Sequence, residues 1–222
     1  MERMKLLGII GSPRSKSNSK IMIEEALKGF KTIVKPDAAI IELSKKTVNH
    51  CTGCNKCSKK KECVFDDDFN EILHQWIEAD ALIYSCPVYH MSVPSKLKAL
   101  IDKLGHVNFS KYKRTLPRFC KVGAVLAQGT SKYGGQELTI QFLTNHLLIM
   151  NCIPVSGDTP GSYLGGPGQS PNWVRGSIKS DDLSLTVARN VGKRLAEMAI
   201  IVKNGLAQSK AFLSEGYILN DG

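Results

Sequence analysis

The sequence predicts an α/β protein with a doubly wound, five-stranded parallel sheet and helices on both faces. Five short apolar runs alternate along the chain with five longer segments of helical periodicity. The runs are continuously apolar, as expected of strands that helices cover on both sides. The 222 residues contain no internal repeat and no linker between two cores, so we expect a single domain, 1–222.

The predicted strands are defined by their apolar content and by the turn residues that follow them. The first ends at Gly11-Ser12-Pro13 and the third at Cys86-Pro87, which suits buried strands that run into loops. The five predicted strands are 5–10, 38–43, 81–84, 122–127 and 153–156.

The predicted helices follow the strands in turn. Aspartates 66–68 are expected in the first turn of the second helix, where the partial positive charge of the helix N-terminus favours carboxylates. Two stretches fit neither pattern: a cysteine-cluster loop at 47–65 and an extended loop rich in Gly, Pro and Ser at 158–181. The five predicted helices are 19–30, 66–79, 95–104, 135–150 and 182–203.

The composition excludes several classes of protein. An apolar fraction of 42% and a charged fraction of 23% are typical of a soluble globular chain, and no stretch approaches the roughly 18 apolar residues of a membrane span. The apolar run 6–10 is too short for a signal peptide, so we expect a cytoplasmic protein without membrane contact. The net charge is +10, but no helix-turn-helix, RNA-recognition signature or long basic tract occurs, so we do not expect nucleic-acid binding.

The loop after the first strand carries groups suited to a phosphate. Residues 11–19 place hydroxyls, an amide and free backbone N–H groups at a helix N-terminus, and Arg14 and Lys16 add charge. The loop is neither a P-loop nor a dinucleotide fingerprint. Ordinary helix capping by Ser17, Asn18 or Ser19 explains the same residues equally well.

The loops after the third and fourth strands also have unusual compositions. Tyr89, His90 and Met91 place flat and polarizable groups where a ring system can stack. Gly134 and Gly135 allow a ligand to approach the backbone closely. A plain turn explains either loop alone, but ligands of doubly wound sheets bind beyond the carboxyl ends of the strands, where all three loops are expected.

Four motifs, taken in order, resemble the NADPH-dependent FMN reductase-like flavoproteins, whose fold is flavodoxin-like. The resemblance covers about the first 155 residues. The motifs are Gly11-Ser12-Pro13-Arg14, Ser85-Cys86-Pro87-Val88-Tyr89, Leu97-Lys98-Ala99-Leu100-Ile101-Asp102 and Gly134-Gly135-Gln136-Glu137.

The resemblance implies an FMN site made by the three loops. It places the FMN phosphate on the first loop, the isoalloxazine on the second, and the third loop near the ring. The implied residues are Ser12, Arg14, Ser17, Asn18 and Ser19 for the phosphate, Pro87, Val88, Tyr89, His90 and Met91 for the ring, and Gln128, Gly129, Gly134 and Gly135 beside it.

Four of the seven cysteines lie within thirteen positions, with the spacing C-x2-C-x2-C-x5-C: Cys51, Cys54, Cys57 and Cys63. Without a signal peptide, such a group indicates metal binding or redox chemistry rather than disulfides. Structural zinc sites usually consist of two separated C-x2-C pairs, whereas successive two-residue gaps resemble iron–sulfur ligation. Zinc and free redox thiols remain alternatives. Cys86, Cys120 and Cys152 flank apolar strands and are expected to be small core residues.

Iron–sulfur flavoproteins within the same family carry this compact spacing, and in them it holds one [4Fe–4S] cluster. The resemblance therefore implies electron transfer from ferredoxin or a similar donor to the cluster, then to FMN, then to dioxygen, peroxide, a quinone or another small acceptor. It also implies a homodimer or homotetramer in which the cluster of one subunit approaches the FMN of another. Lys56, Lys59, Lys60 and Lys61 are a hypothetical steering surface for an acidic ferredoxin.

Two other functions compete with this interpretation. One is a cluster-free NAD(P)H-dependent FMN, quinone or azo reductase, and the other is a flavin-loaded shuttle or sensor. No side chain is assigned a catalytic role, because reduced flavin transfers electrons without a protein nucleophile. The 158–181 loop, with Tyr163, Trp173 and Arg175, could cover the acceptor pocket or join subunits; the sequence does not separate these roles.

Overall fold

A single parallel sheet organises the described part of the chain. The computed structural model describes residues 3–113, 115–158, 160–209 and 213, so the ends of the predicted domain and Thr159 of the predicted loop lie outside the described residues. The strand order is β2-β1-β3-β4-β5, which is the flavodoxin-like order. All paired strands are parallel, and the strands are β1 (Met4–Ile10), β2 (Pro36–Glu42), β3 (Ala81–Pro87), β4 (Val122–Gly129), β5 (Ile153–Val155) and β6 (Gly166–Gln169).

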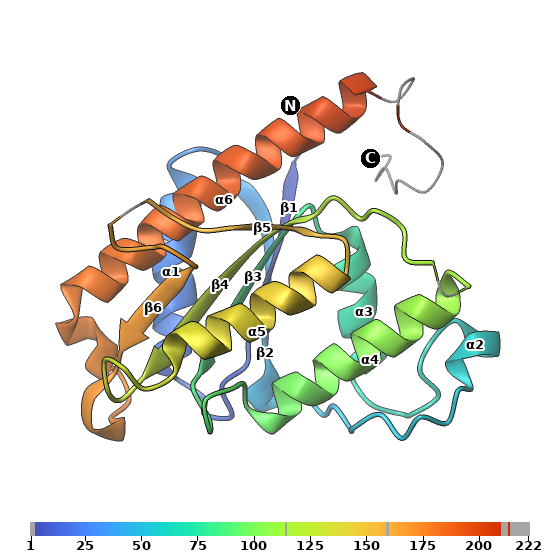
Figure 1. Ribbon diagram of the computed structural model, residues 1–222, viewed down its shortest axis with the longest axis horizontal. Helices are drawn as coiled ribbons and strands as arrows, with labels where there is room; N and C mark the ends of the chain where they lie inside the picture. Colours follow the sequence, from blue (N-terminus) through green and yellow to red (C-terminus); the bar gives the residue numbers. More distant parts are fainter. Residues whose placement is uncertain (1–2, 114, 159, 210–212, 214–222) are drawn as a thin grey trace.

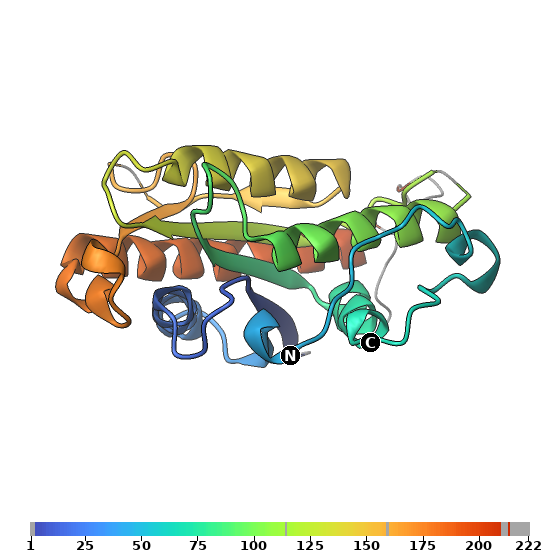
Figure 2. The ribbon, with the colours of Figure 1, turned by 90° about the horizontal axis from the view of Figure 1, so that it is seen from below.

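Alternation along the strands divides the core into two layers. In β1, Leu7 and Ile9 pack with α3, α4 and α5, whereas Leu6 and Ile10 pack with α1 and α6. Figures 1 and 2 show α4 and α5 on one side of the sheet and α1 and α6 on the other. The helices are α1 (Asn18–Lys31), α2 (Cys57–Lys60), α3 (Phe69–Glu78), α4 (Ser95–Lys111), α5 (Gln136–Ile149) and α6 (Asp182–Ser209), with short 3-10 turns η1 (Leu43–Lys45), η2 (Pro171–Trp173) and η3 (Ser177–Ser180).

The predicted fold class is confirmed, and one strand was missed. β6 lies inside the stretch predicted as an extended loop, where it pairs with Leu126–Gly129 beyond the end of the β4–β5 pairing. A Cβ atom at Gly165, just before β6, would lie 2.7 Å from the Val125 carbonyl oxygen, so the glycine permits a close approach of the two backbones that a larger residue would prevent. The glycine-rich composition that predicted a loop is what allows this strand.

The aspartates at 66–68 do not lie in the first turn of a helix. α3 begins at Phe69, and Asp68 is its N-cap residue but makes no side-chain capping bond. Instead, Asp68 accepts a backbone N–H from the preceding loop, and Asp67 forms an ion pair with Lys103 of α4. These carboxylates therefore fasten the 47–65 segment to the helices, and Asp67 also accepts the backbone N–H of Phe69 at the start of α3.

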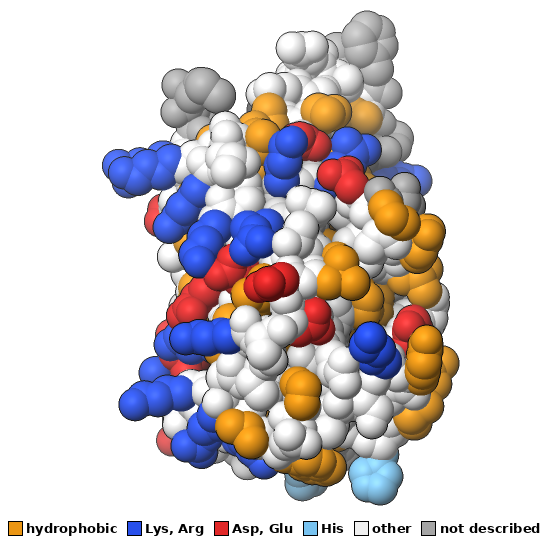
Figure 3. Space-filling model, turned by 90° about the vertical axis from the view of Figure 1, so that its left-hand side faces the viewer, with side chains coloured by type: hydrophobic (Ala, Val, Ile, Leu, Met, Phe, Trp, Pro, Cys, Tyr) orange, Lys and Arg blue, Asp and Glu red, His pale blue; other side chains and the backbone are white. Residues whose placement is uncertain are grey.

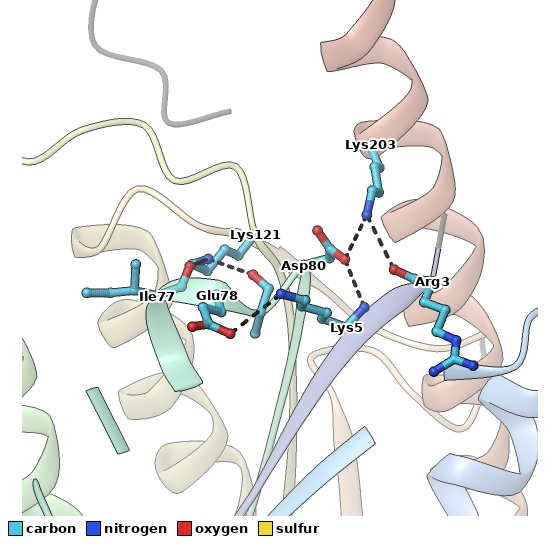
Figure 4. A network of polar contacts seen from close by, with 8 residues as sticks. Arg3, Lys5, Ile77, Glu78, Asp80, Lys121 and Lys203 are labelled. Carbon is cyan, nitrogen blue, oxygen red and sulfur yellow. Dashed lines mark hydrogen bonds and ion pairs between the residues drawn. The ribbon is translucent and has the colours of Figure 1, made fainter. Parts of the chain in front are cut away.

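Polar contacts close the end of the sheet where the strands begin (Figure 4). Asp80 Oδ2 accepts the backbone N–H of Lys5 at 2.8 Å and the Lys203 ammonium at 3.1 Å, which ties β1, β3 and α6 together. The buried Lys121 ammonium donates to two carbonyl oxygens at the end of α3, and burial lowers the pKa of Lys121 to about 8. A cation there satisfies carbonyls that the helix leaves without partners.

The surface carries mixed charge. On the side of the molecule that Figure 3 presents, Lys and Arg side chains lie among Asp and Glu side chains, so the basic excess is not gathered into one uninterrupted patch there. Among the described residues, no helix combines the length and the hydropathy needed to cross a bilayer.

A buried hydrogen-bonded chain links α3, β3 and α5. Trp76 Nε1 donates to the Tyr84 hydroxyl at 2.9 Å, and that hydroxyl lies 3.3 Å from His146 Nε2. Because the hydroxyl accepts from Trp76, its own proton is available to His146, which keeps the imidazole neutral. Burial lowers the pKa of His146 to about 4.

This pKa predicts acid sensitivity. In the unfolded chain His146 titrates near pH 6.5. Between that value and about 4 the unfolded chain binds a proton that the folded protein does not, so the free energy of unfolding falls as the pH is lowered. We expect His146 to account for a loss of about 2 kcal/mol between pH 7 and pH 5.

Urea denaturation of the wild type and of His146→Gln at both pH values measures this contribution. Glutamine keeps a hydrogen-bond acceptor for Tyr84 but does not titrate, so its stability should change less with pH. Equal losses in the two proteins would contradict the prediction.

Candidate functional site

Three loops meet at the carboxyl ends of β1, β3 and β4 and enclose a cavity. They are the loops that the sequence singled out, and they lie together because the strands are parallel neighbours. Ten of the fourteen predicted flavin-binding residues line this cavity: Ser12, Arg14, Ser17, Asn18, Pro87, Val88, Tyr89, Gln128, Gly129 and Gly134.

The first loop presents donors to this cavity. Ser17 is the N-cap of α1 and accepts the backbone N–H of Lys20, while Ser12 Oγ accepts the N–H of Arg14 at 3.2 Å. Both hydroxyl protons remain available to an anion, and the helix N-terminus adds partial positive charge. A Cβ at Gly11 would lie 2.5 Å from Leu97 Cδ2 and 3.0 Å from Cys86 Cβ, so a larger residue would displace the Leu97 side chain of α4.

Four predicted residues are not brought to the cavity wall: Ser19, His90, Met91 and Gly135. Ser19 is fully buried, and its hydroxyl has no hydrogen-bond partner among the described residues. His90 and Met91 form the exposed tip of a turn in which Tyr89 and Ser92 exchange backbone hydrogen bonds. Their assignment to the flavin ring stays a prediction.

The tip of the second loop rests against the third loop. His90 and Met91 both have positive φ, at 46° and 61°, a conformation that non-glycine residues rarely adopt. A Cβ at Gly135 would lie 2.7 Å from Met91 Sδ, so the glycine makes room for the methionine. Gly135 itself has φ of 98°, which also favours glycine. The two loops therefore determine each other's positions.

Five further residues line the same cavity. Thr130 and Ser131 belong to the third loop, whereas Ser170, Trp173 and Arg175 come from the 158–181 segment. Trp173 and Arg175, which the sequence suggests either for covering an acceptor pocket or for joining subunits, lie at the predicted FMN cavity. Nothing in the sequence pointed to Ser170.

All four clustered cysteines line a second cavity, together with Lys103 and His106 of α4. The Cys57 thiol lies 3.3 Å from Ser110 Oγ. The backbone N–H of Lys56, aided by a hydrogen bond from Thr52, lowers the pKa of the exposed Cys54 thiol, which favours the thiolate that metals bind.

The three remaining cysteines differ from this group. Cys86 and Cys152 are buried, as predicted, and burial raises the pKa of both thiols, that of Cys152 to about 12. Cys120 is only partly buried, and burial raises its pKa as well. High thiol pKa values make these cysteines poor ligands and poor nucleophiles.

The donor set of the second cavity fits an iron–sulfur cluster. In the part of the chain that the structure describes, no three Cys, His, Asp or Glu side chains are placed to hold a single metal ion. Four thiols around one cavity are nevertheless the ligands that a [4Fe–4S] cluster takes, one for each iron.

The second loop leads into one end of α4, and α2 of the cysteine-bearing segment lies beside the other end (Figure 1). The helix begins at Ser95, just after the second loop, and it lines the cysteine cavity from Lys103 onward, about 12 Å further along the helix axis at 1.5 Å per residue.

Comparison with known proteins identifies the family. The family model described as NADPH-dependent FMN reductase matches residues 4–161, which is most of the chain. The chain belongs to this family. Members are flavin-dependent oxidoreductases, and FMN is the cofactor that the family implies, which agrees with the donors of the first cavity.

Within the NADPH-dependent FMN reductase family, the chain is similar to proteins named iron–sulfur flavoprotein. One from Methanocaldococcus jannaschii is 38% identical over 200 residues, covering 90% of this chain and 100% of the relative. One from Methanosarcina thermophila is 35% identical over 210 residues, covering 90% and 98%. The solved structure of a WrbA-like flavodoxin from Agrobacterium tumefaciens has the same fold, with a TM-score of 0.57, 17% identity, and coverage of 90% and 99%.

Proposed function

We propose that this oxidoreductase is a cytoplasmic iron–sulfur flavoprotein that carries electrons from ferredoxin or a similar donor, through a [4Fe–4S] cluster and FMN, to a small-molecule acceptor such as dioxygen, peroxide or a quinone. The observation that carries the proposal is that Cys51, Cys54, Cys57 and Cys63 line one cavity. The names of two similar relatives support it.

The residues of the two cavities would hold FMN and the cluster. Ser12, Ser17 and Arg14 would bind the FMN phosphate at the N-terminus of α1, and Pro87, Val88 and Tyr89 would face the ring. When bound, FMN exchanges one or two electrons and the cluster exchanges one, so the pair converts single-electron input into two-electron reduction. The protein would position FMN and the cluster, and the electron transfer requires no nucleophilic side chain.

The exposed rim of the second cavity suits an electron entry port. Lys59 and Lys60 lie exposed on α2, and the Lys61 ammonium donates to the carbonyl oxygens of Ser58 and Ser110. Positive charge at this rim would steer an acidic donor. Because the two cavities of one chain share no lining residue, we propose that subunits of a homodimer or homotetramer bring a cluster close to a partner's FMN.

Iron and sulfide analysis tests this proposal. Protein purified without oxygen should contain iron and inorganic sulfide at about four per FMN. Cys57→Ser should lose the iron and keep the FMN, because its thiol lines only the second cavity. Cys120→Ser, which changes a thiol outside both cavities, should keep both.

Protein that binds FMN but holds no iron would contradict the proposal. It would favour the alternative, a cluster-free NAD(P)H-dependent FMN, quinone or azo reductase, which the description of the matching family supports. Rapid oxidation of NADPH by that protein would then establish the alternative.

A further inference from the structure

The segment 170–175 forms a wall of the FMN cavity although it lies beyond the residues that the family model matches. β6 delivers the chain to this position by pairing with the end of β4, and the Ser170 backbone N–H donates to the Gly129 carbonyl at 2.8 Å. The segment is therefore attached to the third loop of the site.

The phosphate loop holds the other end of this segment. Arg14 Nη1 donates to the Trp173 carbonyl at 2.9 Å, and Asn18 Nδ2 donates to the Val174 carbonyl at 3.0 Å. Asn18 Oδ1 lies 3.5 Å from the Ile178 backbone nitrogen, which donates to it. Asn18, which the resemblance implies for the phosphate, lines the same cavity and also binds this segment through its side-chain amide.

The conformation of the segment is unusual for its residues. Asn172 and Trp173 have φ of 58° and 60°, in the left-handed region that a bulky residue such as tryptophan rarely adopts. The contacts to Arg14 and Asn18 hold this conformation, and strained backbone of this kind is concentrated at ligand sites.

The charge of the cavity wall is suited to a phosphate. Arg14 and Arg175 both line it, and no Asp or Glu is among its lining residues. A guanidinium group presents a planar fork of donors that matches two phosphate oxygens. The 158–181 segment thus brings a second positive charge to the cavity that the first loop lines.

We propose that Arg175 is a second guanidinium ligand of the FMN phosphate and makes the site selective for FMN over riboflavin. This inference rests on FMN occupying the first cavity. Trp173, 71% exposed beside Arg175, lines the same wall.

The test compares the dissociation constants of FMN and riboflavin for protein freed of flavin. Arg175→Gln should weaken FMN binding about 10-fold, since a hydrogen bond to a charged group is lost, and leave riboflavin binding unchanged. Arg175→Lys should recover part of the loss because the charge remains. Lys179→Gln removes an exposed charge from the same segment outside the cavity, so it should change neither constant.

Salt provides a second readout. The tenfold difference between the wild type and Arg175→Gln should shrink as ionic strength rises. Equal weakening of both flavins, or no weakening of FMN, would overturn the role of Arg175. If the wild-type protein binds neither flavin, the assignment of FMN to this cavity fails instead.

Discussion

Replacing Gly192 with alanine is expected to lower the free energy of unfolding by about 3 kcal/mol, because it forces helices α1 and α6 apart. A Cβ at Gly192 would lie 1.8 Å from the Ala26 carbonyl oxygen. The contact is reciprocal, since a Cβ at Gly29 would lie 1.9 Å from the Arg189 carbonyl oxygen. Backbone cannot yield as a flexible side chain can, so the helices must separate.

The matched control is Gly205→Ala on the same helix. No atom lies within 4 Å of a Cβ at Gly205, so only helix propensity acts, and the change should raise stability by up to about 1 kcal/mol. Urea denaturation of the two variants should give shifts of opposite sign. Gly192→Ala with wild-type or greater stability would contradict the close crossing of α1 and α6.

The sequence predicted the strands and the loops that follow them because both depend on local signals. Apolar runs identified β1 through β5, and the loops at Gly11, Pro87 and Gly134 meet in one cavity, as their positions after parallel neighbours required. The spacing of the cysteines likewise predicted that Cys51 and Cys63 would line one cavity. In each case the relevant residues are adjacent in sequence or lie at the ends of paired strands.

What the sequence did not predict depends on packing between distant segments. Gly192 lies where α1 and α6 cross. In the sequence it reads only as a residue that weakens a helix, because its contact with the backbone of Ala26 depends on the packing of the two helices. α4 was expected to end at 104, before Gly105. It continues to Lys111 because Val107 and Asn108 are buried, and tertiary packing outweighs the propensity cost of a glycine.

The contacts of Asn18 show the same limit at the site. The phosphate role that the resemblance implies for Asn18 stays a prediction, whereas the bond from its side-chain amide to the carbonyl of Val174, more than 150 residues later, had no signal in the sequence. Arg175, the residue after Val174, lines the cavity because this distant segment packs against the first loop. A composition rich in Gly, Pro and Ser gave no sign that this segment would form a strand and a wall of the site.

Lys103→Met is expected to cost about 3 to 5 kcal/mol, since it leaves a carboxylate without its charged partner in the protein interior. The Lys103 ammonium lies 2.5 Å from Asp67 Oδ2, and the two side chains are 1% and 0% exposed. Burial alone would raise the pKa of Asp67, but Lys103 and two backbone N–H groups hold the pKa below its usual value, so the carboxyl is ionised at neutral pH.

The double variant Lys103→Met/Asp67→Asn separates a lost charge pair from lost packing. Asparagine keeps one of the two acceptor oxygens, so it can still accept the backbone N–H of Asn49 or that of Phe69, and no buried charge remains. The double variant should therefore be more stable than Lys103→Met alone. Urea denaturation of the wild type, both single variants and the double variant gives the coupling energy. If the double variant is less stable than Lys103→Met, the cost of the single substitution does not come from an unpaired Asp67.

The Lys103–Asp67 ion pair also bears on the cysteine site. Asp67 fastens the cysteine-bearing segment to α4, and Lys103 lines the same cavity as the four thiols.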